Sequence, residues 1–294
     1  MADTTDRSLI SAAQLNRHKV TYRVVLTLVI VVFTLIFIGP LYFLFTDGLK
    51  STSEAVQVPP TIVPAHVHPG TYASAWSRVG IGRLLVNTLY YAFGALAFQL
   101  VFDVAAAYSL SRLRPVLGNL IFALMLATLM IPATVLVVPQ YVTVSDLPLL
   151  HLNLIGSPEA IWLPSVANAF NIFLLKRFFD SIPAELLAAA AIDGASPLRT
   201  LRSVVLPISR PIIGVVSIFA LVAVWKDFLW PLLVEYGYNP NRETLNVGIF
   251  EAASTTPQNL VLAASAMAAV PTLVFFLIFQ RNILSGLTAG SLKG

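Results

Sequence analysis

The residues of this chain that could take part in chemistry do not form a catalytic or metal-binding set. His66 and His68 lie two residues apart without a nearby carboxylate or a third histidine, so we interpret them as solvated loop residues. The motifs G-x-x-x-x-G-K-[ST], H-E-x-x-H and G-x-S-x-G are absent, as is cysteine. We therefore expect no catalytic, cofactor-binding or metal-binding residue, and no nucleotide hydrolysis by the chain itself.

Three ionisable residues stand inside long apolar runs: Asp103, Lys226 and Asp227. A charge at the centre of a membrane helix costs about 2.5 to 3.5 kcal/mol, so such residues need a partner or a function. Lys226 and Asp227 are adjacent and do not face each other on a helix. Asp103 and Lys226 lie toward opposite ends of their runs. We therefore predict that Lys176 or Arg177 pairs with Asp103.

The composition is that of a protein with several membrane spans. Hydrophobic residues make up 57% of the 294 residues, charged residues 11%, and the mean hydropathy is +0.82. The net charge of +4 comes from basic residues scattered over several loops, without interleaved aromatic residues. Binding to nucleic acid is therefore not expected.

Six apolar runs are long enough to cross a bilayer. Backbone amides find no water partner in lipid, and the runs lack the alternation of barrel strands, so we predict helices. The predicted fold is all-α, a polytopic membrane protein with six transmembrane helices at about residues 24–45, 84–110, 120–138, 161–179, 212–233 and 260–279.

The distribution of basic residues predicts the orientation of these helices. Thirteen Lys and Arg residues fall on the side of the N-terminus and four on the opposite side, with Lys226 inside a span. The side richer in basic residues is the cytoplasm. We predict a cytoplasmic N-terminal segment at residues 1–23, one transmembrane domain at 24–279, and a cytoplasmic C-terminal tail at 280–294.

The longest polar interruption in the second half of the chain, residues 180–211, is predicted to form two short helices with a corner between them. Pro183 is suited to a first helical turn, and Gly194 can adopt the positive φ that ends a helix. Ser196 and Pro197 then repeat the start signal. We call this segment the bihelical loop and predict that it is cytoplasmic.

The sequence ELLAAAAIDGAS at residues 185–196 resembles the coupling loop of permease subunits in ATP-binding-cassette importers. The ending RNILSGLTAGSLKG, residues 281–294, is similar to that of the carbohydrate-uptake branch, the maltose-permease type. The resemblance covers roughly the whole chain. One departure is Ala188, where the family usually has a glutamate, so the salt bridge made from that position to the ATPase is not expected here.

The resemblance implies that the chain is one part of a larger importer in the plasma or inner membrane of a prokaryotic cell. Its implied partners are a second, different permease, two copies of an ATPase subunit that binds ATP and magnesium, an extracytoplasmic solute-binding protein, and the lipid bilayer. A sugar or sugar-like solute would cross by alternating access driven by ATP hydrolysis. The residues implied in coupling to the ATPase are Glu185, Ala188, Ala189, Asp193, Gly194, Ala195, Ser196 and Pro197.

The segment WKDFLWP, residues 225–231, resembles a family segment in which an asparagine usually stands at the position of Lys226. This lysine would either bind an anionic or polyhydroxylated solute, or extend to the membrane surface or to the partner permease. The sequence alone favours the second interpretation. Residues considered for the solute pathway are Asn87, Asn168, Asn171, Trp225, Lys226 and Asp227, and those considered for contact with the binding protein are Tyr236, Tyr238 and Arg242.

Two other functions compete with the importer permease. An ion-coupled secondary transporter could use Asp103 and Asp227, although no internal repeat of the kind common in such transporters is apparent. A membrane enzyme or scaffold without transport activity is disfavoured by the lack of a convergent set of reactive side chains.

Overall fold

A computed structural model describes residues 19–289, with side-chain surroundings given for residues 20–280. Over this range the chain is helical, and its β pairing is confined to an isolated bridge between Leu147 and Leu152. The all-α prediction is confirmed. Most of the predicted N-terminal segment, residues 1–18, and the end of the predicted tail, residues 290–294, lie outside the described residues.

Four helices are long: α2 (Lys19–Asp47), α5 (Ile81–Tyr108), α13 (Arg210–Lys226) and α16 (Gln258–Ala289). Two π-helical segments, η1 (Ser109–Leu113) and η2 (Leu201–Val205), lie on the side of the bihelical loop. The remaining helices are α3 (Thr52–Ala55), α4 (Gly70–Val79), α6 (Gly118–Thr128), α7 (Ala133–Ser145), α8 (Glu159–Trp162), α9 (Ala169–Ser181), α10 (Ala184–Ile192), α11 (Pro197–Thr200), α12 (Leu206–Ile208), α14 (Leu229–Val234) and α15 (Leu245–Ala252).

Three stretches of continuous helix in the described residues are long and apolar enough to cross a membrane: Val20–Asp47, Ile81–Leu113 and Gln258–Gln280. Two bent pairs of helices, α6 with α7 and the 197–208 helix with α13, raise the number to five if each pair is one span. Six continuous helices, as predicted, are therefore not observed.

The third, fourth and fifth predicted spans are all interrupted. The fifth, residues 212–233, is divided at residues 227–228 between α13 and α14. α6 and α7 meet at 108°, and the break ends at Pro132, whose ring nitrogen cannot donate a helical hydrogen bond. The fourth span is divided between α8 and α9, which are separated by residues 163–168. Hydrophobicity did not reveal these breaks because both halves of each run are apolar.

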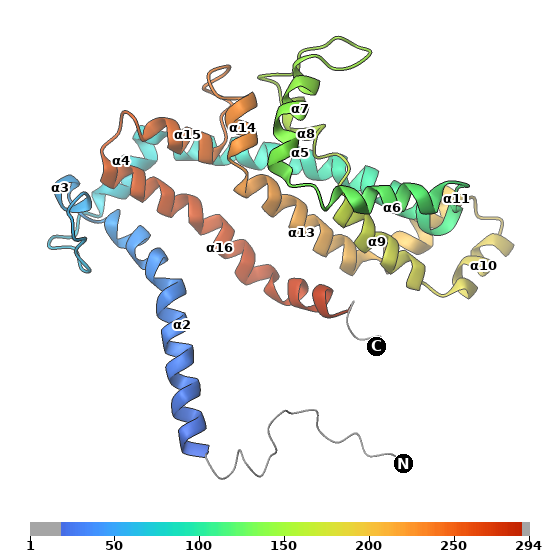
Figure 1. The fold of residues 1–294 in the computed structure, drawn as a ribbon, viewed down its shortest axis with the longest axis horizontal. Coiled ribbons are helices and arrows are strands. Elements are labelled where there is room, and N and C mark those ends of the chain that lie inside the picture. The colour runs from blue at the N-terminus through green and yellow to red at the C-terminus, as the bar shows by residue number, and fades with distance from the viewer. Residues whose placement is uncertain (1–18, 290–294) are drawn as a thin grey trace.

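α5 is the central helix of the bundle, and α13 and α9 pack directly on it. Figure 1 shows α5 running along the length of the molecule, with α9 and α13 beside it. Its close contacts depend on a small residue, because a Cβ atom at Gly94 would lie 2.3 Å from the Trp162 ring. Trp162 also donates a hydrogen bond to the carbonyl of Tyr91 at 3.2 Å, which fixes α8 against α5.

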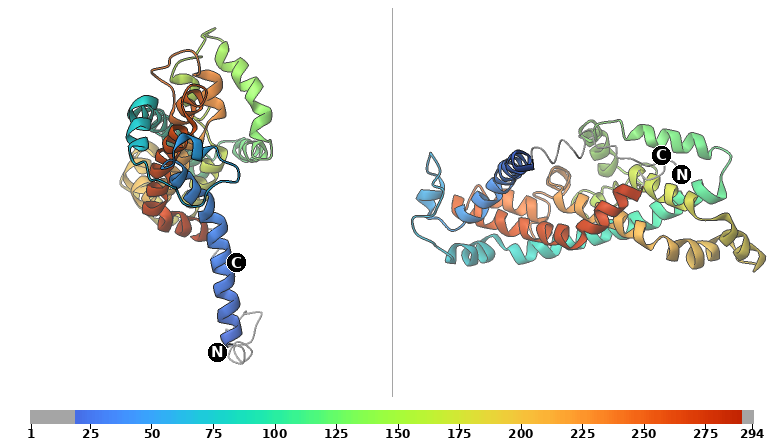
Figure 2. Two further views of the ribbon diagram at one scale, coloured as in Figure 1. Left: turned by 90° about the vertical axis from the view of Figure 1, so that its left-hand side faces the viewer. Right: turned by 90° about the horizontal axis from the view of Figure 1, so that it is seen from below.

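The two ends of the bundle carry different elements. The bihelical loop with α10 and α11 projects at one end, whereas α3, α4 and α15 lie at the other (Figures 1 and 2). α2 contacts the bundle near its C-terminal end and then diverges from it (Figure 1). None of the window that identifies it as a span is buried in this chain.

Candidate functional site

The bihelical loop forms a corner between two short helices. α10 ends at Ile192, and Gly194 follows with φ of +72°, a conformation that residues with a Cβ atom rarely adopt. The Ser196 hydroxyl then accepts a hydrogen bond from the amide of Arg199 and caps α11. The corner at Gly194 and the start of α11 at Ser196 and Pro197 agree with the sequence pattern. Pro183, predicted for a first helical turn, is instead the residue just before α10.

The tip of this loop is exposed. α10 has no buried residue, and Ile192 and Leu198 are 87% and 73% exposed. Leu187 alone among the α10 leucines packs against the core cluster formed by α5, α9 and α13. The residues predicted for coupling share this exposure, except that Ala195 is partly buried: Glu185, Ala188, Ala189, Asp193, Gly194, Ala195, Ser196 and Pro197.

The base of the loop is fixed to the bundle by hydrogen bonds from α5 and η1. The Tyr108 hydroxyl donates to the carbonyl of Pro197 at 2.9 Å, and Ser111 donates to Asp180 at 2.6 Å. Arg112 donates to the carbonyls of Phe179 and Ile182. These hydrogen bonds connect the base of the loop to the end of α5 and to η1.

Asp180 is the acidic member of this base. It forms an ion pair with Lys176 at 2.8 Å. Burial acts to raise the pKa of Asp180, but the hydrogen bonds from Lys176 and Ser111 hold this pKa below its usual value overall. The carboxylate is therefore charged at neutral pH and binds both neighbours.

The predicted pairing of Asp103 with Lys176 or Arg177 is wrong. Lys176 binds Asp180, and the Arg177 guanidinium lies over the Phe173 ring. Asp103 is fully buried, and its Oδ1 accepts from the backbone amide of Asn168 at 2.9 Å. The sequence argument compared only the depths of charged residues along their spans. It could not identify the Asn168 amide as the partner of Asp103, because this amide lacks a helical hydrogen bond only where the fourth span is broken.

Asn168 and Asn171, which were considered for the solute pathway, lie at the start of α9. Asn168 is the N-cap of α9, and its side chain accepts from the amides of Phe170 and Asn171. Asn171 is buried inside the first turn. Both amides are thus placed at the start of α9, and a role in the solute pathway stays a prediction for them.

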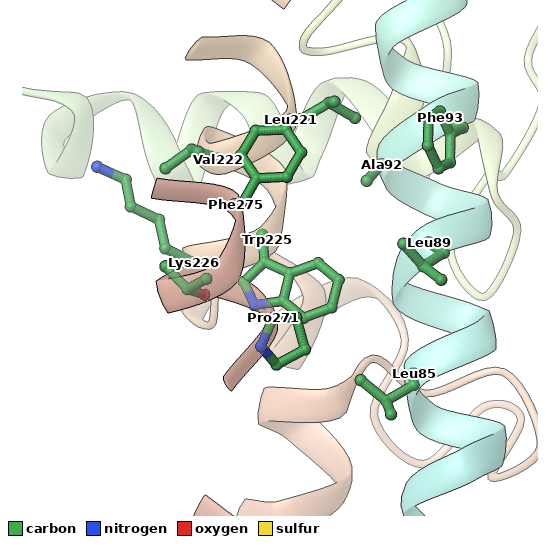
Figure 3. A pocket seen from close by; sticks show the side chains of 11 residues that line it. Leu85, Leu89, Ala92, Phe93, Leu221, Val222, Trp225, Lys226, Pro271 and Phe275 are labelled. Carbon is green, nitrogen blue, oxygen red and sulfur yellow. The ribbon is translucent and has the colours of Figure 1, made fainter. Parts of the chain in front are cut away.

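A cavity of about 250 Å³ lies where α5, α13 and α16 meet. Its walls are apolar, and Trp225 and Pro271 are among the residues that line it, near the middle of the view in Figure 3. Leu85 and Leu89 of α5 form one wall, while the Lys226 side chain extends away from α5 with its nitrogen directed outward (Figure 3). The ammonium group therefore does not enter the apolar cavity.

A second, more open cavity of about 470 Å³ shares Trp225 and Lys226 with the first and also has polar walls. Asn246, Ser265 and Thr272 supply amide and hydroxyl groups, and Phe228 supplies an aromatic face. Asn246 also donates to the carbonyls of Trp225 and Asp227, which fixes the end of α13 where Lys226 stands. This combination of a cation, hydroxyl groups and aromatic rings suits a polar, ring-shaped solute.

At the opposite end of the molecule, residues 235–244, here the 235–244 loop, are held by one face of α5. Tyr91 donates to the buried Glu235 carboxylate at 3.0 Å, and Asn87 donates to the carbonyls of Asn241 and Glu243. Asn87 is therefore directed at this loop and lines neither cavity at Trp225. Tyr236, Tyr238 and Arg242 are exposed on the held loop.

Two carboxylates flank the 235–244 loop and are almost fully buried: Glu235 is 0% exposed and Glu243 is 1% exposed. Burial raises the pKa of Glu235 to about 7, although the Tyr91 hydroxyl and Arg242 act to lower it. Burial and the neighbouring Glu251 raise the pKa of Glu243 to about 7. One oxygen of each carboxylate has no hydrogen-bond partner among the described residues.

Sequence reasoning missed the residues that hold both loops: Tyr108, Ser111, Arg112 and Asp180 at one end, and Tyr91, Glu235 and Glu243 at the other. A signal was present for the carboxylates, because each stands directly beside an apolar segment that ends or begins at the loop. No comparable signal exists for Tyr91 and Tyr108, which look like ordinary aromatic residues of an apolar run.

The chain shows sequence and structural similarity to known transport proteins. Residues 100–288 match the family described as "Binding-protein-dependent transport system inner membrane component". The sn-glycerol-3-phosphate transport system permease protein UgpE of Rhizobium meliloti (strain 1021) is 30% identical over 271 residues, which cover 88% of this chain and 94% of that protein.

The melibiose/raffinose/stachyose import permease protein MelC of Bacillus subtilis (strain 168) is 30% identical over 257 residues, covering 87% of this chain and 91% of MelC. A crystal structure of a bacterial ABC transporter that imports the acidic polysaccharide alginate contains a chain of the same fold, with a TM-score of 0.76, 21% identity, and coverage of 95% and 99% of the two chains. The chain therefore belongs to the family of inner membrane components of binding-protein-dependent transport systems.

Proposed function

We propose that this chain is one of two membrane-spanning subunits of an ATP-driven importer and that it carries a sugar or sugar-like solute into the cell. The observation that supports this most directly is the match to the transport family together with relatives named as permeases for glycerol-3-phosphate and for oligosaccharides. ATP hydrolysis takes place in partner subunits, and this chain reorients in response. The distribution of basic residues supports a cytoplasmic location for the termini and the bihelical loop.

The bihelical loop is proposed as the surface that the ATPase subunits bind. Its tip presents exposed apolar residues, including Ile192 and Leu198, as a surface meant for a partner does. Its base is fixed to α5 by Tyr108 and to η1 by Arg112. To transmit force, the tip of the loop must bind the ATPase subunits and the base must be rigidly attached to the membrane helices.

α2 is proposed to pack against the second permease and the lipid. Its mean hydropathy of 2.9 is the highest of the three continuous spans. It also diverges from the bundle (Figure 1), and none of the window that identifies it as a span is buried within this chain. A helix this apolar has its surface covered by lipid or by another protein.

The 235–244 loop is proposed to contact the solute-binding protein. Tyr236 and Tyr238 are 44% and 58% exposed, whereas the flanking Glu235 and Glu243 are buried. Aromatic side chains on a loop that is already ordered bind at a low cost in conformational entropy.

The solute is proposed to pass beside Trp225 and Lys226, through the more open cavity between α13, α15 and α16. The indole offers a face for stacking against a sugar ring, and the ammonium attracts an acidic group. Replacing Lys226 with asparagine is expected to weaken uptake of an anionic solute at least fivefold, the loss of about one charge-assisted hydrogen bond. Unchanged uptake kinetics for both acidic and neutral solutes would assign Lys226 to the membrane surface or the partner permease.

The proposed function is tested by reconstituting the chain with the subunits that co-purify with it. Uptake is measured with ATP inside the vesicles, with and without an ionophore that collapses the ion gradients. We expect uptake that requires ATP and the binding protein and that continues in the ionophore. Uptake that persists without ATP and stops in the ionophore would favour an ion-coupled transporter instead.

A further inference from the structure

A groove of about 430 Å³ lies between the last turns of α5 and the final part of the bihelical loop, residues 202–210, where the loop leads into α13. Its floor is apolar: Leu100, Val101 and Val104 of α5, with Leu206, Pro207 and Ile213 opposite. Val101 is 67% exposed. Two arginines, Arg202 of η2 and Arg210 at the start of α13, also line this groove.

The positive charges of Arg202 and Arg210 are not paired with an acidic residue in the described part of the chain. Both are exposed, and among the described residues neither guanidinium forms an ion pair or a side-chain hydrogen bond. Two positive charges that line one groove repel each other unless an anion lies between them. Asp180, one of the acidic residues of the bihelical loop, is already bound by Lys176 and Ser111. An anion bound to both arginines would therefore come from outside the described part of the chain.

The depth of the groove indicates what that anion is. Val104 lies one turn before Tyr108, the residue that binds the bihelical loop, so the groove lies where the apolar span ends. An apolar floor rimmed by two arginines at this level matches a molecule with an acyl chain and a negatively charged headgroup. A soluble anion would use the arginines but leave the floor uncovered.

We infer that this groove, here called the basic groove, binds an anionic phospholipid, with the phosphate of its headgroup between Arg202 and Arg210 and an acyl chain along Val101 and Val104. Assigning it to the cytoplasmic leaflet rests on the topology of the proposed function. The bound lipid would cover the joint between the bihelical loop and α13, which bends by 83° at that point. An acidic surface of the ATPase is the competing occupant, but it would not cover the apolar floor.

The experiment measures lipid binding directly. The assembled importer is purified and titrated with phosphatidylglycerol and, separately, with phosphatidylcholine, and bound lipid is counted by native mass spectrometry. The variant R202Q/R210Q is compared with R202K/R210K, which keeps both charges, and with R78Q, which removes an exposed arginine of α4 at the other end of the bundle.

We expect the wild-type complex to retain phosphatidylglycerol in preference to phosphatidylcholine. Each arginine near a membrane surface contributes about fivefold in affinity, so R202Q/R210Q should bind phosphatidylglycerol about 25-fold more weakly. R202K/R210K and R78Q should remain within about twofold of wild type. Inorganic phosphate should not displace the lipid.

Three results would overturn the inference: equal binding of both lipids, undiminished phosphatidylglycerol binding by R202Q/R210Q, or loss of the ATPase subunits from R202Q/R210Q in both lipids. The last would assign the basic groove to the ATPase. Because bound lipid is counted without transport, a failure of the proposed function would leave this measurement valid, and a failure of lipid binding would leave ATP-dependent uptake intact.

Discussion

The two loops at opposite ends of the bundle are built in opposite ways. The 235–244 loop is flanked by buried carboxylates and held along its length by α5. The bihelical loop is held only at its base, and its α10 helix buries no residue. The first loop is held by contacts within this chain, whereas the second leaves its tip exposed.

This difference follows from what each loop is proposed to do. A surface that meets a separate, diffusing protein binds faster and more tightly when it is already ordered. A surface that stays bound to a permanent partner can leave its apolar side chains exposed until assembly. α5 connects the two, because Tyr91 and Tyr108 of the same helix bind one loop each.

The largest effect is expected at the corner of the bihelical loop. Gly194 has φ of +72°, which proline cannot adopt, so Gly194→Pro costs about 3 kcal/mol or more at the corner. The base remains fixed to α5, so the chain should insert and assemble its core normally. We expect uptake to fall at least about 100-fold while the ATPase activity no longer responds to solute.

The matched control is Gly214→Ala in α13, where an added Cβ would meet nothing within 4 Å. Deleting residues 193–195 should reproduce the defect of Gly194→Pro. Wild-type uptake with solute-stimulated ATPase activity in either variant would show that the tip does not transmit force.

A smaller effect is expected where the 235–244 loop is held. Tyr91→Phe removes the hydrogen bond to Glu235 and leaves a buried carboxyl without this partner, at a cost of about 1 to 3 kcal/mol. Proteolysis within the loop should become faster by about fivefold or more. The control is Tyr90→Phe, since Tyr90 is 54% exposed and its hydroxyl has no partner among the described residues. Equal proteolysis of the two variants would contradict the proposed anchoring.

The sequence predicted the fold class and the bihelical loop because these depend on local signals. The length of an apolar run predicts a membrane helix. Within the loop, Pro183, Gly194 and Ser196 are residue types that mark the starts and ends of helices. The same local signals failed at the third and fourth spans, where a break between two apolar halves changes the backbone direction but not the hydrophobicity.

The partners of polar residues could not be predicted, because they lie far apart along the chain. Tyr91 and Glu235 are separated by 144 positions, and the amide that binds Asp103 became free only because α9 begins later than expected. The sequence singled out Trp225 and Lys226 as candidate pathway residues, which stays a prediction, whereas the cavity beside them and the outward direction of the Lys226 nitrogen required the structure.

The pH dependence should differ between the two ends. Burial and its neighbours raise the pKa of Glu243 to about 7, so its stabilising contribution is complete below the pKa of an unfolded glutamate and is lost as the pH rises through about 7. The lowered pKa of Asp180 has the opposite consequence: its contribution is lost only in acid. Hydrogen exchange, corrected for the intrinsic rate, should therefore show the 235–244 loop opening as the pH rises from the usual glutamate pKa of 4.5 to about 7, with little further change above that, while residues 176–182 remain unchanged over this range.

Glu243→Gln should flatten this response, because an uncharged amide replaces the carboxylate. The Arg83, Glu235 and Glu251 side chains that face Glu243 remain in the variant, so a residual dependence from Glu235 is expected. A loop that opens equally in the variant and the wild type would assign the response to Glu235 alone.

The smallest effect is expected from the cap at the tip of the bihelical loop. Ser196→Ala removes the hydroxyl that accepts from the amide of Arg199 at 3.4 Å, at a cost of about 1 kcal/mol or less for an exposed cap. Because Ser196 and Arg199 are both exposed, this loss should stay local: the Arg199 amide exchanges up to about fivefold faster, and the thermal unfolding of the chain is unchanged. Ser203→Ala in η2 is the control, since Ser203 is exposed and caps no helix.

When the ATPase subunits are bound, the difference between Ser196→Ala and wild type should disappear, because the partner then orders the tip. A global loss of stability in Ser196→Ala without partners would show that the tip is part of the folded core, and the contrast between the two ends of the molecule would no longer hold.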